Sequence, residues 1–176
     1  MGRVDKGLQS LRGRPLVAWV LERFEPQVGE ILISANQNLE RYAEFGHRVL
    51  PDAVGGFAGP LAGLERGLKA AAYDLVATAP CDSPFLPRTL VSRLHEALVT
   101  VKADLAVART GDQVHPVFCL CKRSVHPHLG AYLAGGGRKI DTWYATLAMV
   151  EVAFDDEAEA FSNINTLAEL REHEAR

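Results

Sequence analysis

Residues 74–84 read Asp-Leu-Val-Ala-Thr-Ala-Pro-Cys-Asp-Ser-Pro, an apolar run of strand length followed at once by a carboxylate between two prolines. The run Asp74–Ala79 is short and almost wholly apolar, which is typical of a strand buried on both faces of a parallel sheet. Ligands of open parallel sheets bind beyond the carboxyl ends of the strands. Asp82 stands at that place, so it is either a metal-binding carboxylate beside a phosphate or the cap of a turn before Pro84.

Similar apolar runs recur along the chain and alternate with segments of helical period. The expected strands are Glu30–Ala35, Arg48–Leu50, Asp74–Ala79, Asp104–Ala108, Pro116–Cys121 and Met149–Ala153. The expected helices are Pro15–Phe24, Leu61–Ala72, Pro87–Leu98, Val125–Leu133, Arg138–Leu147 and a last one from about Leu167. This alternation predicts a three-layer α/β fold, with a mostly parallel sheet covered by helices on both faces. Because composition nowhere changes abruptly, we expect residues 1–176 to form a single domain.

Composition and charge exclude several classes of function. The 176 residues carry a formal net charge of −3, whereas a protein that binds nucleic acid broadly needs a concentrated basic face. No apolar stretch approaches the roughly 20 residues that a membrane span requires, and the first residues do not resemble a signal peptide. The three cysteines do not suggest a disulfide scaffold. We therefore expect a cytoplasmic protein that binds neither nucleic acid nor membrane.

A second carboxylate and a glycine-rich turn are expected at the same edge of the sheet. Asp52 follows the strand Arg48–Leu50 and can accept hydrogen bonds from a ribose or a base edge, although a lone Asp there is more often part of a solvated turn. Gly59 and Gly63 flank the start of the next expected helix. Glycines at a helix start let backbone N–H groups approach an anion, and the helix dipole favours that anion.

Three more polar residues are candidates at this edge. Lys6 lies in what would be the first loop between a strand and a helix, where its compact ammonium suits a phosphate, although a surface lysine is the default interpretation. Ser34 and Asn36 come at the end of the strand Glu30–Ala35. Their hydroxyl and amide could read a base or could belong to an ordinary polar loop.

The C-terminal third offers a second set of polar residues. Asn163 and Asn165 alternate just before the last expected helix, so in an extended segment both amides point the same way. They could bind a ligand rich in heteroatoms or merely cap that helix. Arg138 and Lys139 follow three glycines and could bind a second anion or form a solvated basic loop.

Other common active-site patterns are missing from the sequence. Cys119 and Cys121 share one face of an expected strand, but no second pair completes a zinc site, so we interpret them as small core residues. There is no G-x-S-x-G motif and no complete G-x-x-x-x-G-K-[ST] motif.

Together these motifs resemble the molybdenum cofactor guanylyltransferase (MobA) family of the nucleotidyltransferase superfamily, over essentially the whole chain. The lysine segment, Gly-Pro-Leu-Ala-Gly and the strand-end Asp are shared with the wider superfamily. The combination of Cys-Asp-Ser-Pro with His-Pro and Asn-Ile-Asn-Thr is more specific and indicates the molybdopterin enzyme. The matching segments are Met1-Gly2, Asp5-Lys6-Gly7, Arg14-Pro15-Leu16, Ser34-Ala35-Asn36, Pro51-Asp52, Gly59-Pro60-Leu61-Ala62-Gly63, Pro80-Cys81-Asp82-Ser83-Pro84, His115-Pro116 and Asn163-Ile164-Asn165-Thr166.

The resemblance implies a Rossmann-like nucleotidyltransferase domain that joins GMP from GTP to the terminal phosphate of molybdenum-molybdopterin and releases pyrophosphate. It implies that Lys6 neutralises the triphosphate and that Asp82 holds Mg²⁺, which makes these two the catalytic residues. The nucleotide-binding positions are Lys6, Ser34, Asn36, Asp52, Gly59, Gly63 and Asp82. The molybdopterin-binding positions are Arg138, Lys139, Asn163 and Asn165. Molybdoenzymes or other molybdenum-cofactor proteins are further partners that the resemblance suggests.

The sequence departs from the family pattern at two places. Ser34 stands where the family has an asparagine, so either its hydroxyl or the Asn36 amide is expected to read the base. The family also opens with a strand and a Gly-rich loop that cradles the triphosphate, and only Met1-Gly2 of that loop is present. We expect the natural protein to be about 15–20 residues longer, since one strand and one loop need that length.

Three alternatives remain at this stage. The nearest is a cytidylyltransferase for the same cofactor, or a nucleotidyltransferase for another sugar or cofactor. A second, from another class, is a non-catalytic adaptor that delivers molybdopterin. The third is a structural α/β domain without a binding or catalytic site. The many polar motifs at the ends of the expected strands argue against it.

Overall fold

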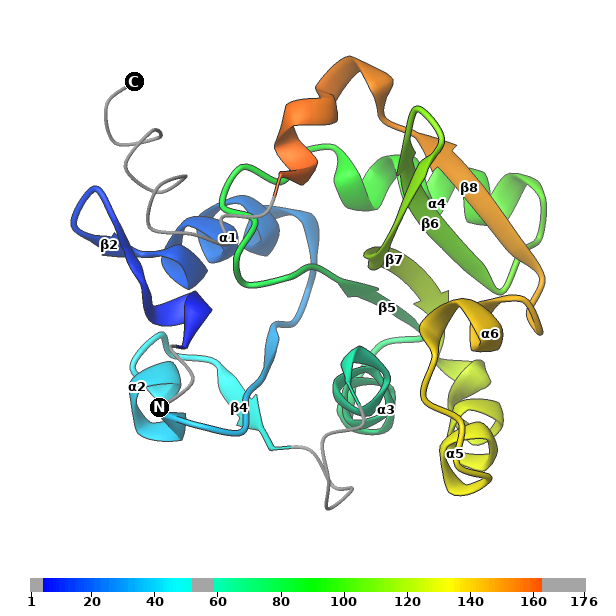
Figure 1. Ribbon diagram of the computed structural model, residues 1–176, viewed down its shortest axis with the longest axis horizontal. Helices are drawn as coiled ribbons and strands as arrows, with labels where there is room; N and C mark the ends of the chain where they lie inside the picture. The colour runs from blue at the N-terminus through cyan, green and yellow to red at the C-terminus, as the bar shows by residue number, and fades with distance from the viewer. Residues whose placement is uncertain (1–4, 52–58, 163–176) are drawn as a thin grey trace.

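The computed structural model describes residues 5–51 and 59–162, and it is an α/β arrangement (Figure 1). The strands are β1 (Ser10–Leu11), β2 (Arg14–Pro15), β3 (Leu32–Ser34), β4 (Arg48–Leu50), β5 (Leu75–Thr78), β6 (Leu105–Thr110), β7 (Gln113–Lys122) and β8 (Met149–Ala153). The α-helices are α1 (Leu16–Phe24), α2 (Leu39–Ala43), α3 (Pro60–Ala70), α4 (Leu90–Thr100), α5 (His126–Ala134) and α6 (Ile140–Tyr144). Short 3₁₀ helices cover Lys6–Leu8, Glu25–Gln27, Arg123–Val125 and Asp155–Phe161.

The largest sheet has four strands in the order β5-β7-β6-β8. β6 and β8 are parallel, whereas β7 runs antiparallel to both β5 and β6. The reversal follows from the chain between β6 and β7, which is a tight turn with Gly111 at a positive φ of 53°. A parallel crossover needs a dozen or more residues, so this short connection can only make a hairpin.

Helices cover both faces of this sheet, as the sequence predicts. On one face, α3, α5 and α6 pack their apolar side chains against β6 and β7, around the fully buried Trp143. On the other face, α4 packs Leu90, Leu94 and Leu98 against Ala106, Leu120 and their neighbours, and Val20 of α1 joins the same cluster. Figure 1 shows α4 and α5 on opposite sides of the strands. The predicted three-layer α/β class is therefore confirmed, with one strand reversed.

A second, smaller sheet holds β3 and β4, which pair in parallel with Leu32 opposite Arg48. Among the described residues, β3 pairs with β4 alone and β5 pairs with β7 alone, so each has one edge without a neighbouring strand. A separate core of Val17, Leu21, Ile33 and Tyr42 packs α1 and α2 against β3.

Most predicted segments appear with shifted ends, and one helix is half as long as predicted. The region predicted as a helix over Arg138–Leu147 contains only the five-residue α6, because Gly135–Gly137 end α5 and Arg138 and Lys139 lie in an irregular stretch. The expected helix from Leu167 lies outside the described residues. Across residues 5–51 and 59–162, no helix is both long enough and apolar enough to cross a membrane.

The buried face of α4 provides a direct test of the packing. We expect Leu94→Ala to lower the free energy of unfolding by about 2–5 kcal/mol, because Leu94 is fully buried and its truncation leaves a cavity. Val99 lies on the same helix with 55% of its surface exposed, so Val99→Ala is the matched control and should change stability little. Urea unfolding of the two variants measures the difference, and equal losses would contradict this packing.

Candidate functional site

The site is centred on Lys6 and Asp82. Asp82 follows β5 in a turn, and its side chain is 12% exposed. Lys6, in the first 3₁₀ helix, places its Nζ atom 3.5 Å from the Asp82 Oδ2 atom. The lysine side chain is 47% exposed, so its ammonium can reach a ligand in the solvent as well as the carboxylate. The structure thus brings together the two residues that the sequence predicts to be catalytic.

Gly7 allows residues 5–7 to lie at once against α2 and against the turn that follows β5. A Cβ atom at this position would stand 2.5 Å from the Tyr42 hydroxyl and 3.0 Å from the Cys81 Sγ atom. Tyr42 is buried and its ring is rigid, so it cannot move aside easily. A side chain at position 7 would therefore displace Lys6 from Asp82.

Asp5 ties the same segment to α2. Its carboxylate accepts hydrogen bonds from the Tyr42 hydroxyl at 2.6 Å and from the Asn38 amide at 2.9 Å. Burial, together with this hydrogen bond to a carboxylate, raises the pKa of Tyr42 far above its ordinary value, so the phenol remains a proton donor to Asp5. Sequence reasoning missed Tyr42 and the structural role of Asp5. In the sequence, only Gly7 next to Lys6 could have indicated that this segment is closely packed.

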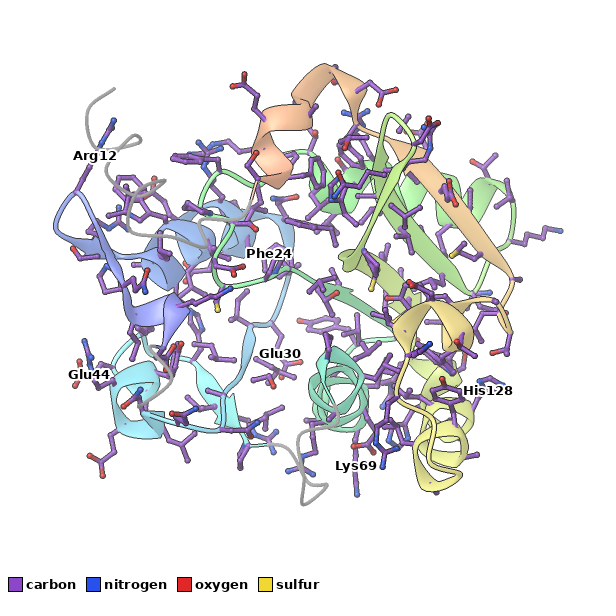
Figure 2. All side chains as sticks on the ribbon, viewed as in Figure 1. Arg12, Phe24, Glu30, Glu44, Lys69 and His128 are labelled. Atoms are coloured by element: carbon purple, nitrogen blue, oxygen red, sulfur yellow. The ribbon has the colours of Figure 1, made fainter. Side chains whose placement is uncertain are left out.

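A cavity of about 900 Å³ lies beside this pair, between β3 and β5. Ser34, Gly59 and Gly63, which the sequence predicts to bind nucleotide, line it together with Pro80 and Cys81. Phe24 and Glu30, both labelled in Figure 2, are also among its lining residues. Three predicted positions, one from β3 and two from the start of α3, therefore meet around one space. Asn36 is exposed just after β3, and Asp52 lies outside the described residues.

The start of α3 forms part of the wall of this cavity. Gly59 has a φ of 68°, which a residue with a side chain rarely adopts, and Pro60 opens the helix. The first N–H groups of a helix have no partner within the helix, and its dipole favours an anion at this end. The arrangement suits a phosphate, as the sequence predicts.

The predicted molybdopterin residues are not brought to this cavity in the described part of the chain. The Arg138 guanidinium donates to the carbonyl oxygens of Leu133 and Gly137, at 2.9 and 2.6 Å, and so caps the end of α5. Lys139 precedes α6, and its carbonyl oxygen accepts a hydrogen bond from Tyr132. Asn163 and Asn165 lie outside the described residues.

The Asp82 carboxylate is a suitable ligand for a magnesium ion that binds together with a nucleotide. Mg²⁺ usually binds through one or two carboxylates and completes its shell with substrate phosphate oxygens and water. Within residues 5–51 and 59–162 there is no cluster of three or more histidine, cysteine, aspartate or glutamate side chains that could form a cage. A single carboxylate beside a lysine is enough for a metal shared with a phosphate.

Cys119 and Cys121 are buried in the core, as predicted. The Cys119 sulfur lies 3.1 Å from the Thr78 hydroxyl and accepts a hydrogen bond from the Tyr144 hydroxyl at 3.3 Å. These two cysteines therefore contribute to packing between the sheet and α6 rather than to the site.

Comparison with known proteins agrees with this geometry. Residues 1–149 match the family model of the MobA-like NTP transferase domain. A molybdenum cofactor guanylyltransferase of Cupriavidus taiwanensis is 53% identical over 181 residues, which cover 100% of this chain and 90% of the relative. The chain belongs to the MobA-like NTP transferase family. A guanylyltransferase of Shewanella putrefaciens is 47% identical and covers 98% of the chain and 88% of that relative. This MobA-like chain is therefore a nucleotidyltransferase.

Solved structures of low sequence identity share its fold. Molybdopterin-guanine dinucleotide biosynthesis protein A from Archaeoglobus fulgidus superposes with a TM-score of 0.78 at 23% identity, covering 97% of the MobA-like chain and 89% of its own. The 2-C-methyl-D-erythritol 4-phosphate cytidylyltransferase of Thermus thermophilus gives 0.72 at 22% identity, covering 97% and 92%. The predicted nucleotidyltransferase fold is confirmed.

The close packing at Gly7 can be tested by adding one methyl group. We expect Gly7→Ala to destabilise the protein by about 1–3 kcal/mol, because the new Cβ atom would overlap the Tyr42 hydroxyl. Gly67→Ala is the control, since a Cβ atom there meets nothing within 4 Å and alanine favours a helix. Thermal unfolding distinguishes them. A Gly7→Ala protein as stable as the unsubstituted one would contradict this packing.

Proposed function

We propose that this nucleotidyltransferase transfers GMP from GTP to the terminal phosphate of molybdenum-molybdopterin, and that the Lys6–Asp82 pair is the centre of the reaction. An oxygen of the molybdopterin phosphate attacks the α-phosphorus of GTP. The bond from that phosphorus to the bridging oxygen of the β-phosphate breaks, and pyrophosphate leaves with the electron pair. The 3.5 Å approach of Lys6 to Asp82 at the end of β5 is the observation that carries this proposal.

Lys6 would neutralise the triphosphate. Two polyanions must approach each other for this reaction, so their mutual repulsion is a large part of the barrier. The half-exposed Lys6 ammonium can contact phosphate oxygens while Gly7 and Asp5 hold its backbone in place. Positioning and electrostatics account for most of the catalysis in such transfers, so no nucleophilic side chain is required.

Asp82 would hold Mg²⁺ between the nucleotide and the attacking phosphate. When bound, the ion supplies a Lewis acid for the transferred phosphoryl group. The carboxylate itself comes from a turn that directly follows a sheet strand, so its position is set by the rigid sheet. Loss of its charge would remove the metal ligand and the ion pair with Lys6.

The remaining predicted positions divide between the two substrates. Ser34 or Asn36 would read the base and Asp52 the ribose or base edge, while Gly59 and Gly63 leave room for the nucleotide beside α3. Arg138 and Lys139, with Asn163 and Asn165, remain the proposed contacts of molybdopterin. Both carbonyl contacts of Arg138 come from its Nη1 atom, and the guanidinium has further N–H donors on Nε and Nη2 that could bind a phosphate. We place the reaction in the cytoplasm, with transfer to molybdoenzymes afterwards.

Replacing the Asp82 carboxylate should stop the reaction without unfolding the protein. We expect Asp82→Asn, in protein produced from its own locus, to lower kcat by roughly 100-fold or more, because the amide is a poor ligand for Mg²⁺. Circular dichroism and the thermal midpoint check the fold. Asp74→Asn is the control, since Asp74 is an exposed carboxylate at the other end of β5. Near-normal guanylyl transfer by Asp82→Asn would refute the assignment.

The preference for GTP or CTP distinguishes this proposal from its nearest alternative, a cytidylyltransferase for the same cofactor. We expect pyrophosphate release with molybdenum-molybdopterin to require GTP, and an excess of CTP to inhibit it little. Preferential use of CTP would favour a cytidylyltransferase for the same cofactor. Binding of molybdopterin without any nucleotide-dependent pyrophosphate release would favour a delivery adaptor.

A further inference from the structure

The Asp5 carboxylate is held at both of its oxygens by residues of α2 and its start. Its Oδ1 atom accepts a hydrogen bond from the Tyr42 hydroxyl at 2.6 Å, and its Oδ2 atom accepts one from the Asn38 amide at 2.9 Å. Asn38 and Tyr42 stand four positions apart, and the Tyr42 N–H donates to the Asn38 carbonyl oxygen, so their side chains lie on one face. Two donors on the two oxygens of one carboxylate fix its rotation as well as its place.

Asn38 does not use its side chain for its own helix. Asparagine directly before a helix is favoured because its side-chain oxygen caps one of the first N–H groups. Asn38 has this position before α2, but its side chain makes no capping hydrogen bond. Its φ is 52°, in the left-handed region that residues with a side chain enter at a cost in energy. A strained residue whose amide instead contacts Asp5, 33 positions away, indicates that this contact has a role beyond the helix.

Tyr42 is the rigid side of this contact. It is 4% exposed and packs with Val17, Leu21 and Ile33 in the core between α1, α2 and β3. A ring in a close-packed core cannot shift unless its neighbours shift as well. The position of Asp5 is therefore set by this core rather than by the short segment in which Asp5 lies.

Asp5 transmits this position to Lys6 through the backbone. Asp5 directly precedes the 3₁₀ helix Lys6–Leu8, but its carboxylate makes no capping hydrogen bond to that helix. Both of its oxygens accept from α2 and its start instead. Lys6 is the next residue, and its Nζ atom lies 3.5 Å from the Asp82 Oδ2 atom. Because a lysine side chain has many rotamers, the place of its backbone limits where the ammonium can go.

We propose that Asn38 and Tyr42 are positioning residues for the transfer reaction, and that they act on Lys6 through Asp5. The inference rests on the role proposed above for Lys6 at the triphosphate, and neither residue would touch the substrate. Misplacing a group by about 1 Å can lower a rate by about 100-fold. Because Lys6 would contact the charge that moves onto the leaving pyrophosphate, loss of this support should lower kcat more than it raises KM.

Removing the Tyr42 hydroxyl alone tests this role. We expect Tyr42→Phe, in protein produced from its own locus, to lower kcat of GTP-dependent pyrophosphate release about tenfold and to change KM for GTP less than about twofold. Tyr144→Phe is the matched control, because Tyr144 is also buried and its hydroxyl donates to the Pro116 carbonyl oxygen at 2.8 Å. The control should keep its kcat while its thermal midpoint falls as in Tyr42→Phe. An unchanged kcat in Tyr42→Phe, or an equal loss of kcat in the control, would overturn the proposal.

Asn38→Gly separates activity from stability. Glycine adopts a φ of 52° without strain but has no amide that could donate to Asp5. We expect kcat to fall about threefold to tenfold while the thermal midpoint changes little, because relief of the strain offsets the lost hydrogen bond. Lys102→Gly is the matched control, since Lys102 has a φ of 57° in the turn between α4 and β6. The control should keep its kcat, and full activity of Asn38→Gly would contradict the proposal.

Combining Tyr42→Phe with Lys6→Met shows whether the tyrosine acts through the lysine. We expect the double variant to be as active as Lys6→Met alone, because two residues that act on one interaction are not additive. A further tenfold loss in the double variant would overturn the positioning role. A weakly active Lys6→Met beside a fully active Tyr42→Phe would overturn this inference alone. A fully active Lys6→Met would overturn the proposed role of Lys6 as well.

Discussion

The structure depends on the close approach of residues 5–7 to two elements at once. Asp5 is hydrogen-bonded to Tyr42 of α2, Lys6 is paired with Asp82 after β5, and Gly7 lies between them where no side chain fits. This contact joins the unit of β3 and β4 to the four-stranded sheet at the carboxyl ends of their strands. It also positions Lys6, because the same three residues hold its backbone in place. If Lys6 has the catalytic role proposed above, stability and function are coupled at this one point of the chain.

The sequence predicted the layers of the fold because periodicity records which side chains are buried. Apolar runs identified the strands, and the helices on both faces followed from their alternation with helical segments. The direction of β7 could have been predicted only from the short connection at Gly111, since its apolar pattern is the same in either direction. The helix predicted over Arg138–Leu147 is only half as long in the structure, because three consecutive glycines end α5 and Arg138 caps that end instead of opening the next helix.

The site was predictable where it lies at strand ends. Asp82 and Ser34 were predicted from the rule that ligands bind beyond the carboxyl ends of parallel strands. Gly59 and Gly63 were predicted from the affinity of a glycine-rich helix start for an anion. The structure places Ser34, Gly59 and Gly63 around one cavity next to Lys6. Tyr42 was missed because it acts from the interior of a short helix, and nothing in the local sequence distinguishes it from a core aromatic residue. The roles of Asp82 and of the three cavity residues stay predictions, as do those of Asp52, Asn163 and Asn165, which lie outside the described residues.

The two tryptophans lie in different parts of the molecule, so the fluorescence of each one reports on its own surroundings. Trp19 lies in α1, donates to the Leu11 carbonyl oxygen and has the Arg14 guanidinium 4.5 Å from its ring centre. Trp143 is fully buried in α6 and donates to the His128 ring at 2.9 Å. A buried indole emits at shorter wavelength than a half-exposed one. The loosening of the part around α1 can therefore be followed separately from that of the four-stranded sheet, without any added label.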